Sequence, residues 1–245
     1  MIEFHGVTKK FGSTNVLNDL TIHVKRGSTV ALLGLSGSGK TTALKLVCGL
    51  HFPDTGTVSI NGTPLTRDIL PELRKDIGYV IQDGGLFPHL TVYQNLALVG
   101  REAQIPDEAI RSRVNELADM TKISKSTMTR YPREISGGQR QRVGIMRALF
   151  LNPSMLLLDE PFGALDPITR SSLQEDLRAL CREMGKTVLM VTHDIYEAGY
   201  MADTILLLNQ GRIAQAGSLR DLMLNPANEF VQLFTNSQRH IGIEA

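Results

Sequence analysis

Cysteine is scarce in this sequence, and neither cysteine belongs to a metal-binding or disulfide pattern. Among 245 residues there are two, Cys48 and Cys181, with no CxxC pair and no cluster of histidines. Zinc sites and disulfide frameworks need several such residues at characteristic spacings. We therefore expect neither, and predict that both thiols are buried and reduced.

Long apolar runs and an excess of one charge are also missing. No stretch reaches the ~18 apolar residues that cross a bilayer, and the opening MIEFHGV is unlike a signal peptide. The chain has 26 basic and 25 acidic residues, whereas nucleic-acid binding usually shows as a strongly basic domain. We expect a soluble, cytoplasmic protein that binds no nucleic acid and serves a membrane only through a partner.

The sequence does contain a regular alternation of strand-like and helical segments. Apolar, strand-like segments at residues 29–33, 155–158 and 187–191 alternate with helices, which favours an α/β fold with a mainly parallel core sheet. The opening third is instead a succession of strand-like stretches and turns, so we expect an N-terminal antiparallel β portion. Between Gln82 and Met155 the pattern is helical and predicts an inserted α-helical subdomain.

A glycine-rich loop follows the first of these buried strands. Residues 34–41, GLSGSGKT, match G-x-x-x-x-G-K-[ST] between a strand and a helix, as a phosphate-binding loop requires. Its backbone N–H groups wrap a phosphate, Lys40 adds positive charge, and the Thr41 hydroxyl is suited to Mg²⁺. The predicted ATP-binding residues here are Gly34, Leu35, Ser36, Gly37, Ser38, Gly39, Lys40, Thr41 and Thr42.

A pair of acidic residues ends a second buried strand. In MLLLDE, residues 155–160, four apolar residues deliver Asp159 to the carboxyl end of the strand, where phosphates bind in such sheets. We predict that Asp159 holds Mg²⁺. Glu160 is one residue further on, where it is able to act as general base toward an attacking water.

Three other residues stand where a bound nucleotide would be contacted. His193 ends the segment 187–191 and is predicted to contact the γ-phosphate and orient the attacking water; the alternative is a structural histidine. Gln82 ends a strand and begins the helical insertion, so it is a candidate to sense Mg²⁺. Phe11 precedes a glycine and is a candidate to stack on adenine, with core packing as the alternative.

A second phosphate-binding pattern opens a helix about a hundred residues downstream. In EISGGQRQRV, residues 134–143, Ser136 is placed to cap a helix whose N-terminus favours anions. Two such helix starts in different lobes cannot both hold one nucleotide in a single molecule, but they can in a head-to-tail pair. The pair Arg140 and Arg142 is interpreted as a solvated helix face.

The order of these motifs along the chain resembles that of the ABC-type ATPases, with GALD at residues 163–166 as a further shared segment. This resemblance implies a P-loop NTPase (RecA-like) core and an ATP-bound homodimer that sandwiches two ATP molecules. It implies catalytic roles for Glu160, His193 and Gln82, and Mg²⁺ binding by Thr41, Gln82 and Asp159. The residues implied to act on the partner's nucleotide are Ser136, Gly137, Gly138, Gln139 and Asp166.

Finer segments are similar to the ATPase subunits of importers for osmoprotectants such as glycine betaine, carnitine and choline. These segments are IGYVIQ, GLFPHLTV, DPITRSSLQ and NPANEFV, whereas Asp83-Gly84, Phe11, Leu35 and Ile135 depart from the usual pattern. The likeness implies polytopic permease subunits, a solute-binding protein beyond them, and a location on the inner face of the cell membrane. Phe87, Pro88, His89 and Leu90 would line the groove for the permease, unless they form a buried loop.

The same likeness implies one ABC ATPase domain over residues 1–245. Its nucleotide-binding core would comprise residues 1–83 and 154–225, its helical signature subdomain residues 84–153, and its C-terminal extension residues 226–245.

Three other functions remain as alternatives. The first keeps an importer but changes its cargo to another small solute, such as a polyamine or an amino acid. The second is an ABC ATPase acting on DNA or ribosomes, which the absence of sustained heptads between Gln82 and Ser136 and the single nucleotide module disfavour. The third, a small-molecule kinase, leaves Ser136–Gln139 without a role.

Overall fold

The structure is a computed structural model that describes residues 1–163 and 165–239. One compact unit comprises Met1–Pro71 together with the chain from Thr187 onward, and a second comprises Glu72–Lys186. Residue 164 of the GALD segment and residues 240–245 of the predicted C-terminal extension lie outside the described residues. Within the described ranges, no helix combines the length and apolar character needed to cross a bilayer.

The first unit contains an antiparallel sheet with the strand order β2-β1-β4-β5. Its strands are β1 (Ile2–Phe11), β2 (Thr14–Val24), β4 (Thr55–Ile60) and β5 (Thr63–Pro64). The turn between β4 and β5 is Asn61-Gly62, where both residues have positive φ angles, 52° and 78°. Two-residue hairpins of type I′ require positive φ angles at both central residues. The predicted N-terminal antiparallel β portion is confirmed.

A second set of strands in the first unit has the order β10-β9-β3-β8. They are β3 (Thr29–Gly34), β8 (Thr187–Thr192), β9 (Thr204–Asn209) and β10 (Arg212–Gly217). β3 runs parallel to both β8 and β9, and β10 is antiparallel to β9. Every residue of β8 is buried, as expected of a parallel strand covered on both faces. The predicted parallel core is therefore confirmed.

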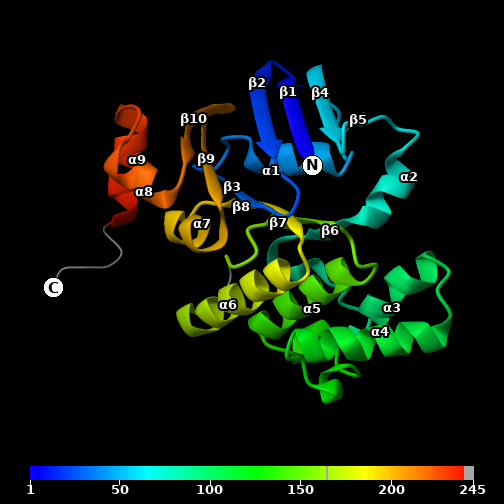
Figure 1. Cartoon of the computed structure of the whole chain (residues 1–245). Coiled ribbons are helices and arrows are strands. Elements are labelled where there is room, and N and C mark those ends of the chain that lie inside the picture. The colour runs from blue at the N-terminus through cyan, green and yellow to red at the C-terminus, as the bar shows by residue number, and fades with distance from the viewer. Residues whose placement is uncertain (164, 240–245) are drawn as a thin grey trace. The chain divides into compact units, whose positions relative to one another are not determined.

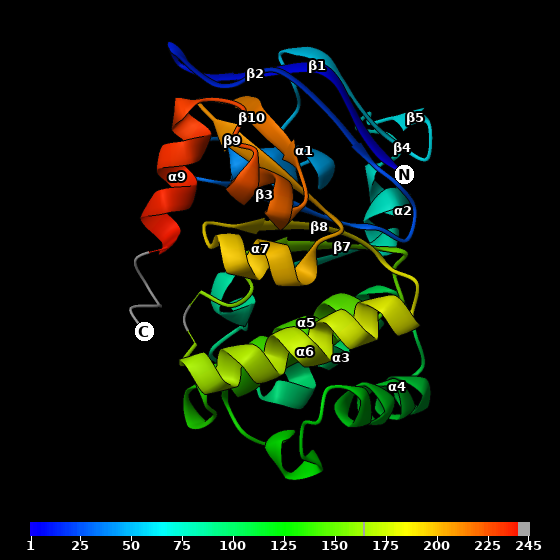
Figure 2. The same cartoon turned by 60° about the vertical axis from the view of Figure 1, so that its left-hand side comes forward.

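In the part of this unit that the structure describes, the helices that accompany these strands or border the unit are α1 (Lys40–Val47), α2 (Leu70–Leu73), α7 (Ile195–Met201), α8 (Leu219–Leu224) and α9 (Glu229–Arg239). Helices α8 and α9 pack against each other and against β10 (Figures 1 and 2). Helix α1 follows β3 directly after the glycine-rich loop, so the loop joins a buried strand to a helix N-terminus, as predicted.

The second unit, apart from residue 164, combines a pair of parallel strands with α-helices. The strands are β6 (Ile77–Val80) and β7 (Met155–Asp159), and the helices are α3 (Val92–Glu102), α4 (Asp107–Met120), α5 (Gly137–Leu149) and α6 (Pro167–Glu183). Short 3₁₀ turns occur at Arg74–Asp76, Gln82–Gly85, Lys125–Thr127 and Pro132–Glu134. Helices α3, α4 and α5 pack together, and α6 lies along α5 (Figures 1 and 2).

The predicted helical insertion corresponds to α3, α4 and α5, which all lie between β6 and β7 in the sequence. In α4, Ile110, Val114 and Leu117 are at most 2% exposed and form its buried face. The second compact unit also includes β6, β7 and α6, so its limits differ from residues 84–153. The functional division into a core and a signature subdomain stays a prediction. Both cysteines are buried, as predicted.

Candidate functional site

The glycine-rich loop of the first unit is shaped by backbone conformations that side chains would obstruct. Gly34 has a φ of 152°, and a Cβ atom there would lie 2.5 Å from the Leu208 carbonyl oxygen. Gly39 has a φ of 102°, and a Cβ atom there would lie 2.6 Å from the Val16 carbonyl oxygen. The loop is thus fixed by close approaches to β9 and β2, and only glycine fits at these two positions.

The N-terminus of α1 is prepared for an anion. Gly39, its N-cap, provides no side-chain cap, so the first-turn N–H groups rely on other partners. Lys40 is 6% exposed, and its Nζ donates hydrogen bonds to the carbonyl oxygens of Gly34 and Leu35, each at 2.8 Å. The Ser38 Oγ is buried without a hydrogen-bond partner among the described residues. These groups form a polar cradle suited to a phosphate.

His193 lies at the same edge of the first unit's parallel strands as this loop. Leu33 of β3 is paired in register with Thr192 of β8, so His193 follows β8 where Gly34 ends β3. The His193 side chain is exposed. The structure therefore brings His193 beside the loop, as expected of a residue that contacts a terminal phosphate, and its catalytic role stays a prediction.

Phe11 ends β1, and its side chain is 45% exposed, so the alternative of ordinary core packing is wrong. Its ring meets the His51 ring edge-on at a centroid distance of 5.2 Å, and the Lys9 ammonium lies 5.5 Å from its centroid. Stacking requires that one face of the aromatic ring is accessible to the nucleotide base. Stacking on adenine stays a prediction.

In the second unit, Asp159 ends a strand whose preceding four residues are fully buried. The Tyr79 hydroxyl of the neighbouring strand β6 donates a hydrogen bond to the Asp159 Oδ2 at 3.2 Å. This contact orients the carboxylate. Tyr79 lies within the IGYVIQ segment but could not be predicted as a partner of Asp159, because no spacing rule relates it to a residue 80 positions away.

Glu160 follows with a backbone φ of 47°, a conformation that few residues other than glycine adopt. A Cβ atom on Gly163 would lie 3.6 Å from the Glu160 Oε2 and 3.7 Å from the Gln82 Nε2. The side chains of Glu160 and Gln82 therefore converge on the same small residue. Their predicted roles, as general base and as Mg²⁺ sensor, require such convergence.

Ser136 is the N-cap of α5, as predicted. Its Oγ accepts a hydrogen bond from the Gln139 N–H at 3.2 Å, and its own N–H donates to the Gln139 Oε1 at 3.0 Å. This capping box fixes the start of the helix. Gly137, in the first turn, lines a cavity of about 10 Å³ together with Glu160 of the same chain. Gly137 thus lies near the predicted base of its own chain.

Asp166 is the N-cap of α6 and accepts a hydrogen bond from the Thr169 N–H at 3.0 Å. Hydrogen bonding from Thr169 holds the pKa of Asp166 below its ordinary value, so this exposed carboxylate is ionised near neutral pH. Its predicted action across a dimer interface stays a prediction.

One interpretation of the sequence is wrong. Arg142 is not on a solvated helix face, because its side chain is 14% exposed and its Nη1 lies 2.6 Å from the Asp176 Oδ2. Its partner is on α6, more than thirty residues away. Arg140 is half-buried and donates to the carbonyl oxygen of Ile135 at 2.9 Å.

The predicted permease-facing loop is a surface feature. Phe87, Pro88 and His89 are exposed, so the alternative of a buried loop is wrong for these three residues. A fully buried side chain, Asn95, holds the loop: its Oδ1 accepts from the Phe87 N–H at 2.7 Å. Its Nδ2 donates to the carbonyl oxygens of Phe87 and Leu90, each at 3.1 Å. No motif in the sequence predicts this role of Asn95.

Comparisons with known proteins agree with these motifs. The ABC transporter family matches residues 17–163. The glycine betaine/carnitine/choline transport ATP-binding protein of Bacillus subtilis (strain 168) is 43% identical over 98% of this chain and 64% of that protein. The glycine betaine uptake system ATP-binding protein of Escherichia coli (strain K12) is 42% identical over 96% of this chain and 76% of that protein. The chain thus spans less than two thirds of the first of these relatives.

The dimeric, post-hydrolysis structure of the ATP-binding cassette MJ0796 bound to ADP and Pi is similar with a TM-score of 0.81 and 35% identity. The likeness covers 90% of this chain and 99% of that one. The fold is accordingly that of a P-loop NTPase cassette, with the strand order and helices described above. The phosphate-binding loop, the acidic strand end, the capped signature helix and both comparisons lead to one conclusion: the chain belongs to the ABC transporter ATP-binding family.

Proposed function

We propose that this chain is the ATP-binding and ATP-hydrolysing subunit of an ABC importer for quaternary-amine osmoprotectants such as glycine betaine, choline and carnitine. The observation that carries the proposal is a relative of glycine betaine uptake, 42% identical over 96% of this chain, combined with a complete set of phosphate-site residues. An importer for another small solute, such as a polyamine or an amino acid, is the alternative, because the cassette itself does not touch the cargo.

Hydrolysis is assigned to named residues. Lys40 moves its ammonium from the carbonyl oxygens of Gly34 and Leu35 to the β- and γ-phosphate oxygens of ATP. Glu160 accepts a proton from the attacking water, and His193 orients that water against the γ-phosphate. Phe11 stacks on the adenine, which fixes the base while the phosphates react.

The residues predicted to hold Mg²⁺ fit that ion chemically. Thr41 offers a hydroxyl, Gln82 a carboxamide oxygen and Asp159 a carboxylate that Tyr79 already orients. Proteins usually supply only a few oxygen ligands to Mg²⁺. Water molecules and substrate phosphate oxygens are its other ligands. When bound, the ion neutralises charge on the β- and γ-phosphates.

The ATP-bound form is proposed to be a homodimer. In it, Ser136, Gly137, Gly138 and Gln139 of one subunit would close over the γ-phosphate held by the partner subunit, and Asp166 would cross the interface. The N-terminus of α5 favours an anion at this place. The similarity to a dimeric cassette with ADP and Pi supports this arrangement.

The proposed partners are polytopic permease subunits and, through them, an extracytoplasmic solute-binding protein. The exposed loop Phe87–Leu90, held by Asn95, is the proposed contact with the permease. The cassette would therefore be cytoplasmic and peripheral on the inner face of the cell membrane. Residues 1–83 and 154–225 would serve as its nucleotide-binding core, residues 84–153 as its signature subdomain, and residues 226–245 as a C-terminal extension.

The first experiment tests ATP hydrolysis and ATP-dependent dimerisation. The Glu160→Gln variant is expected to bind ATP, to hydrolyse it at least about 100-fold more slowly than the wild type, and to sediment as a dimer with ATP and Mg²⁺. Lys40→Ala in the same background is the matched control and should remain monomeric. A Glu160→Gln variant that stays monomeric at saturating ATP would contradict the sandwich.

The second experiment tests whether the protein belongs to an importer and which solute that importer transports. Tagged protein is captured from gently solubilised native membranes, and the complex is reconstituted in vesicles with its solute-binding protein. Stimulation of ATP hydrolysis by glycine betaine or choline, but not by spermidine or glutamate, supports the osmoprotectant proposal. The reverse selectivity supports the alternative cargo, and co-purified ribosomes or nucleic acid would overturn the importer.

A further inference from the structure

Helices α5 and α6 begin at the two segments that the proposed function places at the dimer interface. Ser136 caps α5 and Asp166 caps α6. The first turns of these helices touch, because a Cβ atom on Gly138 would lie 2.4 Å from the Thr169 Cγ2. The Thr169 N–H also donates to the Asp166 carboxylate at 3.0 Å. The two helix starts are therefore in direct contact.

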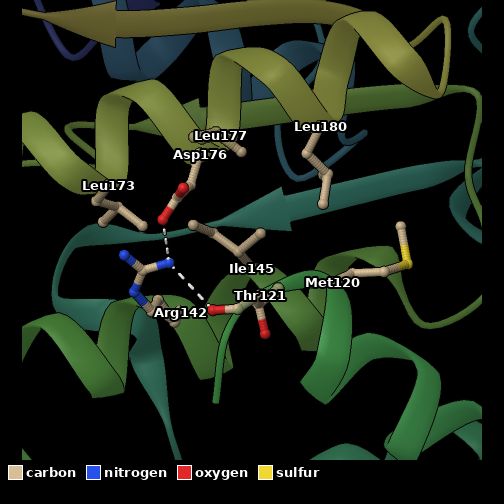
Figure 3. Close-up of a pocket in the computed structure, with 8 residues that line it drawn as sticks. All are labelled: Met120, Thr121, Arg142, Ile145, Leu173, Asp176, Leu177 and Leu180. Carbon is tan, nitrogen blue, oxygen red and sulfur yellow. Dashed lines mark hydrogen bonds and ion pairs between the residues drawn. The ribbon is translucent and has the colours of Figure 1, made fainter.

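Further along the same two helices, an ion pair joins them (Figure 3). The Arg142 Nη1 lies 2.6 Å from the Asp176 Oδ2, and the two side chains are only 14% and 15% exposed. The Arg142 Nη2 also donates to the Ser172 Oγ at 3.3 Å. Because both side chains are largely shielded from water, salt screens this ion pair less than it screens a surface pair.

The same two charged groups connect α5 and α6 to the end of α4. The Arg142 Nη1 donates to the Thr121 carbonyl oxygen at 3.0 Å, directly after α4 (Figure 3). The Lys122 Nζ donates to the other Asp176 oxygen, Oδ1, at 2.7 Å. Asp176 thus forms an ion pair with Arg142 of α5 and accepts a hydrogen bond from Lys122 after α4, and so connects three parts of the second unit.

The apolar side chains between α5 and α6 define the register of the two helices less strictly than the Arg142–Asp176 ion pair does. Ile145 of α5 and Leu173, Leu177 and Leu180 of α6 line a cavity of about 10 Å³. That volume is at most one water molecule. Apolar contacts are non-directional, whereas two opposite charges that are shielded from water favour the register in which they meet.

We propose that Asp176 is a positioning residue for ATP hydrolysis: through Arg142 it fixes α5 against α6, so that Ser136 and Asp166 reach the partner subunit's nucleotide as one rigid body. This inference rests on the proposed dimer. It assigns no contact between Asp176 and the nucleotide. Its prediction is that loss of the pair lowers the rate of hydrolysis and the stability of the dimer, while ATP binding by the monomer is unchanged.

The primary test is Asp176→Asn, with Glu175→Gln as the matched control, since Glu175 is an exposed carboxylate on the same helix. Asp176→Asn is expected to lower kcat at least tenfold and to weaken ATP-dependent dimerisation in the Glu160→Gln background by a similar factor. The ATP affinity of the monomer should change less than twofold, and Glu175→Gln should behave as the wild type. An Asp176→Asn variant with wild-type kcat would overturn the proposal.

Two further variants separate positioning from folding. Asp176→Glu keeps the carboxylate and should restore at least half of kcat. The double variant Arg142→Met, Asp176→Leu replaces the pair by apolar side chains and should keep a wild-type melting temperature while kcat stays low. Full activity of a stable double variant would overturn the proposal. If the double variant does not fold, the kcat values of Asp176→Asn and Asp176→Glu decide whether the proposal holds. If the wild type itself neither dimerises nor hydrolyses ATP, the proposed function fails instead.

Discussion

The Tyr79 hydroxyl donates a hydrogen bond to Asp159, the predicted Mg²⁺ ligand, across a donor–acceptor distance of 3.2 Å. Tyr79 belongs to β6 and Asp159 to β7, and the parallel register sets Tyr79 beside Leu157, two residues before the acid. The carboxylate is therefore not a freely rotating group at the end of its strand. Strand pairing and one hydroxyl give it an orientation before any nucleotide binds.

Tyr79→Phe is expected to lower kcat/KM for MgATP about three- to tenfold and to raise the Mg²⁺ concentration that gives half-maximal activity. The reason is that Asp159 loses its donor, and a typical hydrogen bond contributes about 1 kcal/mol. A titration of ATPase activity with Mg²⁺ measures the effect. Tyr196→Phe removes the hydroxyl of an exposed tyrosine and is the control. An unchanged Mg²⁺ dependence in Tyr79→Phe would contradict the orienting role.

Gly34→Ala is expected to destabilise the fold more than Gly12→Ala does. Both glycines have positive φ angles, but a Cβ atom on Gly34 would lie 2.5 Å from the Leu208 carbonyl oxygen, whereas Gly12 has open space around it. The Gly12 variant bears conformational strain alone, about 1–2 kcal/mol, and the Gly34 variant adds the steric clash. Urea unfolding of the two variants measures the difference, and equal losses would refute the clash.

Cys181 is expected to resist alkylation in the native protein. Burial raises the pKa of this thiol to about 12, although Lys186 nearby lowers it in part. At pH 8 the reactive thiolate is then about one part in ten thousand, compared with roughly a quarter for an ordinary cysteine. In a Cys48→Ser variant, iodoacetamide should label Cys181 only in denaturant, as mass spectrometry can measure. Rapid labelling of the folded protein would contradict this expectation.

The stability that Asp176 contributes is expected to depend on pH in the acid range. Partial burial raises the pKa of Asp176, but hydrogen bonds from Lys122 and Arg142 outweigh it and hold that pKa below its ordinary value. The folded state therefore binds the proton more weakly than the unfolded chain, whose pKa is about 3.9. The stabilisation is complete above this value and is lost as the pH falls through the lower folded-state pKa.

Urea unfolding of the wild type and Asp176→Asn at a series of pH values tests this dependence. The difference in free energy of unfolding should be constant from about pH 6 to pH 8 and should shrink below about pH 4. Glu175→Gln again serves as the control. A difference that grows toward acid pH would have the wrong sign and would refute the assignment.

The sequence predicted those features that depend on neighbours along the chain. The phosphate-binding loop, the Ser136 cap and the acidic end of β7 are each encoded within about ten residues, and each was located correctly. Tyr79 and Asn95 were missed, because their partners are chosen by strand pairing and loop packing. Arg142 was misassigned for a related reason: its exposure depends on α6, and a helix sequence alone does not tell which face another helix will cover.

The backbone at Glu160 has a consequence for engineering. Its φ of 47° costs roughly 1–2 kcal/mol for a residue with a side chain. Glycine at this position would remove that cost, and asparagine would reduce it, but neither keeps the proposed base. A selection for thermal tolerance alone would therefore favour chains with an altered residue 160, and would enrich stable cassettes that bind ATP and no longer turn it over.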